Sequence, residues 1–201
     1  PGADNLVLRA AAALQRATGC RLGADILLEK HIPVGAGMGG GSADAAAALS
    51  GLNRLWGLSL SPGELAGIGL SIGADVPFCL SGGLQRARGI GETLTPLPCG
   101  RQFWLVVVLP CRGLSTRKVF SALRLEEVQA ANVPDTEAAR EALARGDLPA
   151  LEKAMGNVLE PVSESLRPQI PQARRALMHQ GARRAMMTGS GAAVYGVFAG
   201  A

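Results

Sequence analysis

The chain has 201 residues, with 48% hydrophobic and 18% charged residues and a net charge of +4. This composition is typical of a globular protein with a well-filled core and excludes an intrinsically disordered chain. No stretch approaches the roughly 20 apolar residues that cross a bilayer, so we expect no membrane partner. The basic residues are scattered, with Arg174-Arg175 and Arg183-Arg184 as the densest pairs. A nucleic-acid partner would need a clustered basic stripe, so we expect none.

In the first half of the chain, apolar periodicity and helix-boundary residues predict three helices. The first runs over 4–18, with Asp4 as its N-cap and Gly19 as its stop; the others run over 42–56 and 61–72. The third opens on the capping box Ser61-Pro-Gly-Glu64. Strands are expected over 25–30, 76–80, 84–88 and 94–97, with 76–80 and 84–88 paired across Ser81-Gly-Gly83.

In the second half, strands and helices interleave. The segment 103–109 is the clearest strand, and its unbroken apolar character predicts a central position in a sheet. A change of composition near Pro98-Cys-Gly100 divides the chain into predicted domains of residues 1–98 and 99–201, each part of a mixed α+β fold. The other expected elements are strands over 184–188 and 193–198 and helices over 116–125, 135–145, 148–157 and 169–180.

The run from Pro33 to Asp44 is the most informative feature of the sequence. It places five glycines between Gly35 and Gly41, directly before the alanine-rich stretch 45–49. A glycine cluster is a poor helix or strand, whereas alanine is the best helix former. A loop that leads into a helix N-terminus gathers free N–H groups and the positive end of the helix dipole, which attract phosphate. Ser42, at the junction, is a candidate helix cap or phosphate donor.

Two common phosphate-binding loops fit this run poorly. The P-loop needs a lysine after its glycines, and none follows here. The dinucleotide pattern G-x-G-x-x-G is matched by Gly35, Gly37 and Gly40, but such a match is nearly inevitable in so glycine-rich a run. That pattern should also follow a buried strand directly and meet an acidic residue at the end of a second strand. Neither condition is met here.

Two further motifs carry candidate chemistry. Asp75 lies between a predicted helix end and the apolar run Val76-Pro-Phe-Cys-Leu80, where a carboxylate is costly to bury without a partner or a role. Taken alone, it reads more simply as a turn aspartate. Gly189-Ser-Gly191 is expected to be a hairpin turn, a second glycine loop near phosphate, or both at once. The two histidines and four cysteines match no metal-binding spacing, so we expect no metal held by the protein. The cysteines lie far apart in the sequence, and we expect a reducing, cytoplasmic compartment.

The segment 33–48 resembles the ATP-binding motif of the GHMP kinases. The triple glycine Gly39-Gly-Gly41 is similar to the branch that acts on 4-diphosphocytidyl-2-C-methyl-D-erythritol. Five ordered segments share the resemblance: Asp4-Asn-Leu6, Leu70–Pro77, Gly89-Ile-Gly-Glu92, Asn157-Val-Leu-Glu160 and Thr188-Gly-Ser-Gly-Ala192.

The resemblance implies a two-domain fold, with an N-terminal part like ribosomal protein S5 domain 2 and a ferredoxin-like C-terminal domain. It implies transfer of a phosphoryl group from ATP, accompanied by Mg²⁺, to the 2-hydroxyl of this small-molecule substrate, with Asp75 as the catalytic residue. Thr188, Gly189, Ser190 and Gly191 are expected near phosphate or acceptor. The implied ATP-binding residues are Pro33, Val34, Gly35, Ala36, Gly37, Met38, Gly39, Gly40, Gly41, Ser42 and Ala43.

The sequence departs from the family pattern in places. Met38 and Ala43 stand where leucine and serine are common. The family opens with a strand-rich segment that holds a phosphate-facing lysine and an Asp-Gly-Tyr-His stretch, and nothing here resembles either. We therefore expect these 201 residues to be part of a longer chain and to show no measurable kinase activity alone. The alternatives are another GHMP kinase, of homoserine or mevalonate type, and a non-catalytic nucleotide-binding module.

Overall fold

The computed structural model describes residues 2 and 4–200, and these form two compact units. The first unit holds the chain up to His31 and the segment Gly39–Leu97. The second unit holds Ile32–Met38 and the chain from Pro98 onward. The glycine-rich loop is therefore divided, because its first residues pack with the second unit. Both units mix helices and strands, which confirms the predicted α+β class.

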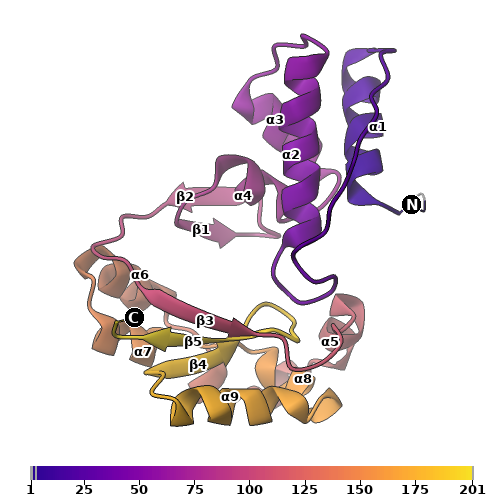
Figure 1. The fold of residues 1–201 in the computed structure, drawn as a ribbon. Coiled ribbons are helices and arrows are strands. Elements are labelled where there is room, and N and C mark those ends of the chain that lie inside the picture. Colours follow the sequence, from indigo (N-terminus) through magenta and orange to yellow (C-terminus); the bar gives the residue numbers. More distant parts are fainter. Residues whose placement is uncertain (1, 3, 201) are drawn as a thin grey trace. The chain divides into compact units, whose positions relative to one another are not determined.

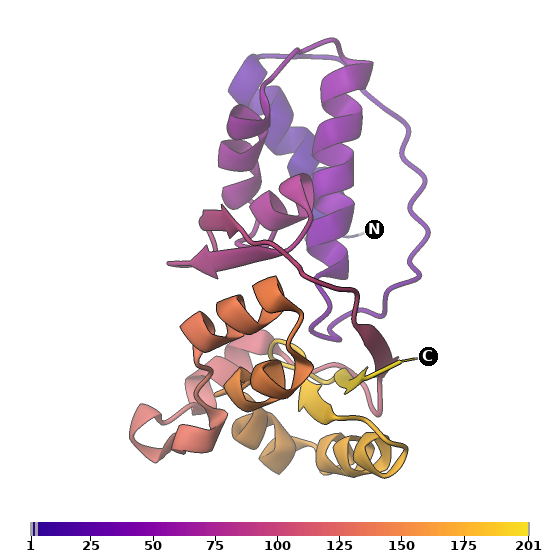
Figure 2. The ribbon, with the colours of Figure 1, turned by 90° about the vertical axis from the view of Figure 1, so that its left-hand side faces the viewer.

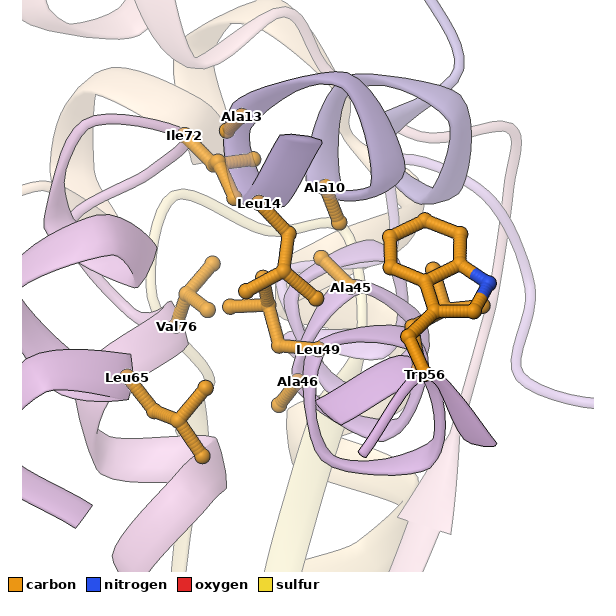
Figure 3. Close-up of a cluster of buried hydrophobic side chains, with 11 residues drawn as sticks. Ala10, Ala13, Leu14, Ala45, Ala46, Leu49, Trp56, Leu65, Ile72 and Val76 are labelled. Carbon is orange, nitrogen blue, oxygen red and sulfur yellow. The ribbon is translucent and has the colours of Figure 1, made fainter. Parts of the chain in front are cut away.

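The first unit is built on helices that surround an alanine- and leucine-rich core. Helices α1 and α2 lie side by side, and α3 and α4 pack with α2 (Figure 1). Figure 3 shows the core, in which Leu14 of α1 and Leu49 of α2 are fully buried beside Val76 of α4. The elements are α1 (Leu6–Thr18), α2 (Gly40–Leu55), α3 (Pro62–Leu70), α4 (Val76–Ser81), β1 (Gln85–Arg88) and β2 (Thr93–Pro96).

Local signals place the ends of two of these helices. Helix α1 ends at Gly19, which takes the left-handed conformation, as predicted. Its N-cap is Asn5, whose side chain accepts a hydrogen bond from the Val7 N–H, so the prediction of Asp4 was one residue off. The predicted capping box of α3 is confirmed, since Ser61 and Glu64 bond each other's backbone N–H groups.

Two predicted strands of the first unit are wrong. Residues 25–30 form no strand, because no neighbouring strand in the described chain pairs with them. Leu27 in this segment is 88% exposed, and the segment runs alongside α2 as irregular chain (Figure 2). Residues 76–80 form helix α4, with Pro77 in its first turn, where proline is favoured. Strand β1 therefore pairs with β2 in an antiparallel hairpin instead.

The second unit holds a three-stranded antiparallel sheet in the order β3-β5-β4, with α9 packed against β4 and β5 (Figure 1). Ile170 and Leu177 of α9 are buried with Ala185 and Met187 of β4. The elements are β3 (Trp104–Val108), α5 (Thr116–Ala122), the 3₁₀ turns η1 (Leu125–Glu127) and η2 (Ala130–Asn132), α6 (Thr136–Arg145), α7 (Leu148–Ala154), α8 (Glu160–Leu166), α9 (Gln169–His179), β4 (Arg184–Met187) and β5 (Val194–Phe198).

Strand β3 does not lie at the centre of its sheet, contrary to the prediction. Among the described residues it pairs with β5 alone, and Trp104 and Leu105 are 54% and 56% exposed. An unbroken apolar run is typical of a strand that is buried on both faces, and the prediction of a central position was based on that pattern. Helix α8 was not predicted. Pro161 in its first turn and Glu160 beside it were the available signals.

Candidate active site

In the first part of the glycine-rich loop, Ile32–Met38, two glycines adopt a backbone conformation that would be strained for other residues. Gly35 and Gly37 have φ angles of +71° and +75°. Other L-residues adopt this conformation at a cost of about 1–2 kcal/mol. The backbone at these two positions therefore requires glycine.

This part of the loop is bonded to the second glycine motif, which lies more than 150 residues later in the chain. The Ala193 N–H donates to the Ala36 carbonyl oxygen at 3.0 Å. The Thr188 hydroxyl donates to the Gly37 carbonyl oxygen at 2.9 Å. The packing is so close that a Cβ on Gly37 would lie 2.5 Å from the Thr188 carbonyl oxygen. Two motifs that the sequence singled out separately are thus in direct contact.

The second part of the loop forms the N-terminus of α2 in the first unit. Gly39 is the N-cap, with φ of +67°, and no side chain caps the helix. The first intrahelical bond there runs from the Ala43 N–H to the Gly39 carbonyl oxygen at 2.9 Å. The N–H groups of Gly40, Gly41 and Ser42 therefore have no partner within the helix. The prediction of Ser42 as cap is wrong, because the helix begins two residues before it.

An ion pair lies beside this helix N-terminus in the same unit. The Lys30 ammonium contacts a carboxylate oxygen of Asp44, and both side chains are partly exposed. Lys30 stands two residues before the loop begins, and Asp44 stands early in α2. The pair therefore joins the chain segments that enter and leave the glycine-rich loop.

Asp75 is the N-terminal flanking residue of α4 and is exposed. Its side chain makes no capping bond, so the carboxylate is not committed to the helix. Burial, followed by the nearby charge of Asp75, raises the pKa of the Cys79 thiol. A Cβ on Gly73 would lie 4.0 Å from the Ser42 hydroxyl oxygen, so the turn that carries Asp75 lies close to the α2 N-terminus. Asp75 does not enter a buried strand, and the expected desolvation cost does not arise.

The hairpin turn between β1 and β2 packs against Ala74, the residue before Asp75. No function was predicted for this turn from the sequence. The Glu92 carboxylate accepts from the Ile90 N–H at 2.7 Å and closes the β1–β2 turn. Within that turn, Gly91 has φ of +109°, and a Cβ there would lie 3.0 Å from the Ala74 carbonyl oxygen. The turn therefore helps to fix the backbone at Ala74, next to Asp75.

The second glycine motif joins β4 to β5 in the second unit. The turn is closed by the bond from the Gly191 N–H to the Thr188 carbonyl oxygen at 2.9 Å. The Ser190 hydroxyl is 2.9 Å from the Thr116 hydroxyl, so it already has a partner. A cavity of about 400 Å³ lies beside Thr188 and Gly189. Its lining includes Phe120, Val158, Met186 and Tyr195.

A buried acid, Glu160, bonds the backbone of Met187 just before this motif. Glu160 is 4% exposed and pairs with Arg174. Burial raises the pKa of Glu160, an effect that the Met187 N–H and the Arg174 guanidinium oppose without cancelling. The pKa of Tyr195 is also raised, first by burial and then by the charge of Glu160.

The residues described here do not gather three His, Cys, Asp or Glu side chains closely enough to hold a metal ion. Across the same described residues, no helix combines the length and the apolar character that a membrane crossing requires.

Comparison with known protein families gives two matches. The GHMP kinases N terminal domain matches residues 5–83, and the GHMP kinases C terminal domain matches residues 139–200. The first match includes the α2 N-terminus and Asp75, and the second includes the second glycine motif.

Curated relatives agree with the family match. The chain is 46% identical over 194 residues to 4-diphosphocytidyl-2-C-methyl-D-erythritol kinase of Symbiobacterium thermophilum, covering 96% of this chain and 68% of the relative. It is 46% identical over 199 residues to the enzyme of that name from Moorella thermoacetica, covering 98% and 70%. The relative from Alkaliphilus metalliredigens is 42% identical, with coverage of 97% and 66%. The chain therefore spans about two thirds of the length of these relatives.

Solved structures show the same fold. A crystal structure of 4-(cytidine 5'-diphospho)-2C-methyl-D-erythritol kinase matches with a TM-score of 0.81 at 40% identity, covering 99% of this chain and 70% of that one. Homoserine kinase from Cytophaga hutchinsonii matches with a TM-score of 0.83 but at 21% identity, covering 96% and 66%. The second likeness is one of fold alone.

Proposed function

The chain belongs to the 4-diphosphocytidyl-2-C-methyl-D-erythritol kinases, a branch of the GHMP kinases, and we propose that its full gene product phosphorylates that substrate. The γ-phosphoryl group of ATP is transferred to the 2-hydroxyl of 4-diphosphocytidyl-2-C-methyl-D-erythritol. This hydroxyl is on a tertiary carbon. The free cysteines, Cys20, Cys79, Cys99 and Cys111, support placing the reaction in a reducing cytoplasm.

The observation that carries the proposal is the uncapped N-terminus of α2 at the end of a loop of left-handed glycines. The N–H groups of Gly40, Gly41 and Ser42 and the positive end of the helix dipole favour a polyphosphate there. Without a Cβ, glycines allow the backbone to approach phosphate oxygens closely. We assign residues 33–43 to binding the ATP phosphates. Val34 and Met38 are exposed and contribute through their backbone positions.

Asp75 is proposed as the residue that engages the acceptor hydroxyl. Its carboxylate is exposed and caps no helix, and its turn lies close to Ser42 at the α2 N-terminus. A carboxylate in that place orients the substrate hydroxyl and accepts its proton as the new O–P bond forms.

The motif Thr188–Gly191 is proposed to hold Ala36 and Gly37 in place and to lie near phosphate or substrate. The adjoining cavity of about 400 Å³ falls in the size range of small-molecule sites. Mg²⁺ is proposed to arrive with ATP and to be held mainly by phosphate oxygens and water, where it neutralises phosphate charge.

The acceptor is tested with a panel. The full gene product is supplied with ATP and, separately, with the cytidyl substrate, homoserine and mevalonate, and ADP release is followed by a coupled assay. We expect turnover with the cytidyl substrate alone. Turnover with homoserine or mevalonate would assign the protein to another GHMP branch. ATP binding without turnover of any acceptor would favour a non-catalytic nucleotide-binding module.

A further inference from the structure

Three polar side chains in and before α8 all bond the same short stretch of backbone at the end of β4. The Asn157 amide donates to the carbonyl oxygens of Met187 and Gly189, at 3.0 and 2.8 Å. Glu160 accepts from the Met187 N–H at 2.6 Å. The Ser163 hydroxyl donates to the Ser190 carbonyl oxygen at 3.1 Å. These side chains therefore bond two backbone groups of Met187, at the end of β4, and two of the second glycine motif, in Gly189 and Ser190.

The bonds made by Glu160 and Ser163 are buried, whereas those of Asn157 are more exposed. The buried polar or charged residues of the described chain are Glu160, Ser163 and Ser190, and all three take part in this set. Burying polar groups is costly even when they are bonded, and apolar replacements of a buried ion pair are often neutral or stabilising. Stability alone is thus a weak reason for a carboxylate at position 160. Precise placement of the bonded backbone is a stronger one.

The bonded backbone also contacts the first part of the glycine-rich loop, Ile32–Met38. Thr188 lies between the residues that Glu160 and Asn157 hold, and its hydroxyl donates to the Gly37 carbonyl oxygen. Because Gly37 packs directly on the Thr188 backbone, a shift of the turn must move Gly37 or break this contact. All these residues belong to the second unit.

We propose that Asn157, Glu160 and Ser163 are positioning residues for the nucleotide, acting through the second glycine motif on Ala36 and Gly37. The inference rests on the proposed function, in which the loop binds the phosphates of ATP. It assigns a role to the Asn157-Val-Leu-Glu160 segment, for which the sequence offered none.

The test compares Glu160→Leu with Glu160→Gln and with two controls on the same helix. Leucine removes the acceptor for the Met187 N–H, whereas glutamine retains an acceptor oxygen. Glu164→Leu also removes a partner of Arg174, and Ser165→Ala removes a hydroxyl bonded to Val162, but neither residue bonds β4. Ser163→Ala is a milder variant that tests the same proposal if Glu160→Leu fails to fold.

Four quantities are measured in the full gene product at a temperature where circular dichroism shows each variant folded. These are the ATP dissociation constant by calorimetry, kcat, KM for ATP, and the backbone amide resonance of Gly37. For Glu160→Leu we expect the dissociation constant and KM for ATP to rise about tenfold, with kcat at saturating ATP changed by less than about threefold. Ser163→Ala should raise both by about threefold. The Gly37 resonance should move in both variants, and Glu160→Gln should restore most of the affinity.

The outcomes separate this inference from the proposed function. If the unmodified protein binds ATP while Glu160→Leu and Ser163→Ala match the two controls in affinity and in Gly37 resonance, the inference is overturned and the proposed function stands. If the unmodified protein binds no ATP, both are overturned. A loss of kcat with unchanged ATP affinity would also contradict a positioning role at the nucleotide.

Discussion

The Thr188 hydroxyl donates a hydrogen bond of 2.9 Å to the carbonyl oxygen of Gly37, joining the second glycine motif to the proposed phosphate loop. Thr188→Val keeps the shape of the side chain but removes the donor. One such bond contributes about 0.5–1.5 kcal/mol, so the KM for ATP should rise about two- to tenfold. Steady-state kinetics check this, with Thr188→Ser as the control that retains the hydroxyl. An unchanged KM in Thr188→Val would show that the bond does not support nucleotide binding.

Gly37 and Gly35 offer a matched pair, because both have positive φ but only Gly37 lacks room for a side chain. A Cβ on Gly35 would meet Gly113 at an ordinary 3.5 Å, whereas one on Gly37 would meet the Thr188 backbone at 2.5 Å. Gly35→Ala should lower the free energy of unfolding by about 1–2 kcal/mol. Gly37→Ala should lose about 1–3 kcal/mol more through overpacking. Urea denaturation measures both, and equal losses would refute the close contact.

Asp75→Asn tests the proposed acceptor residue. Asparagine keeps the shape but neither carries the charge nor accepts the proton, so kcat should fall by about 10²–10⁴-fold. The melting temperature should stay close to that of the unmodified protein, because Asp75 makes no capping bond. ATP affinity, measured by calorimetry, should also persist. Near-normal kcat in a folded variant would remove Asp75 from the mechanism.

The stability of the protein should depend on pH through Glu160. Its pKa is raised in the folded state by burial and by Glu164, against the lowering effects of the Met187 N–H, Arg174 and Arg184. A carboxyl with a raised folded pKa favours the folded state most at low pH, and this contribution is lost as the pH rises through the folded value. From about pH 4 upward, the free energy of unfolding of the unmodified protein should therefore fall relative to that of Glu160→Gln.

Urea denaturation at several pH values checks this dependence, with Glu164→Gln as the control on the same helix. A difference between the unmodified protein and Glu160→Gln that grows with pH in favour of the glutamate would contradict it. That result would mean that the pairing with Arg174 outweighs the cost of burial.

Local signals in the sequence were enough to predict much of the fold. Gly19 ends α1 and the Ser61–Glu64 capping box opens α3, because these residues act on the backbone beside them. The predictions were wrong where packing against distant parts of the chain determines the secondary structure. The apolar run at 76–80 suits a strand or a buried helix equally, and Pro77 in the first turn favours the helix that forms.

The proposed site was predictable in its parts and not in its connections. The glycine loop, Asp75 and the second glycine motif each have a local pattern. The bond between Thr188 and Gly37 spans 151 residues, and no local periodicity encodes it. The bond between Glu160 and the Met187 N–H was missed for the same reason, since Met187 lies on a strand that comes later in the chain.

Phosphorus NMR of one reaction mixture tests the central claim most directly. The full gene product is mixed with ATP, Mg²⁺ and 4-diphosphocytidyl-2-C-methyl-D-erythritol, and the spectra are followed over time. We predict that the γ-phosphorus signal of ATP decays while a single phosphomonoester signal grows. That signal should show no coupling to a carbinol proton, because the 2-hydroxyl is on a carbon without hydrogen. A new signal split by a carbinol proton, or no transfer to this acceptor at all, would contradict the account.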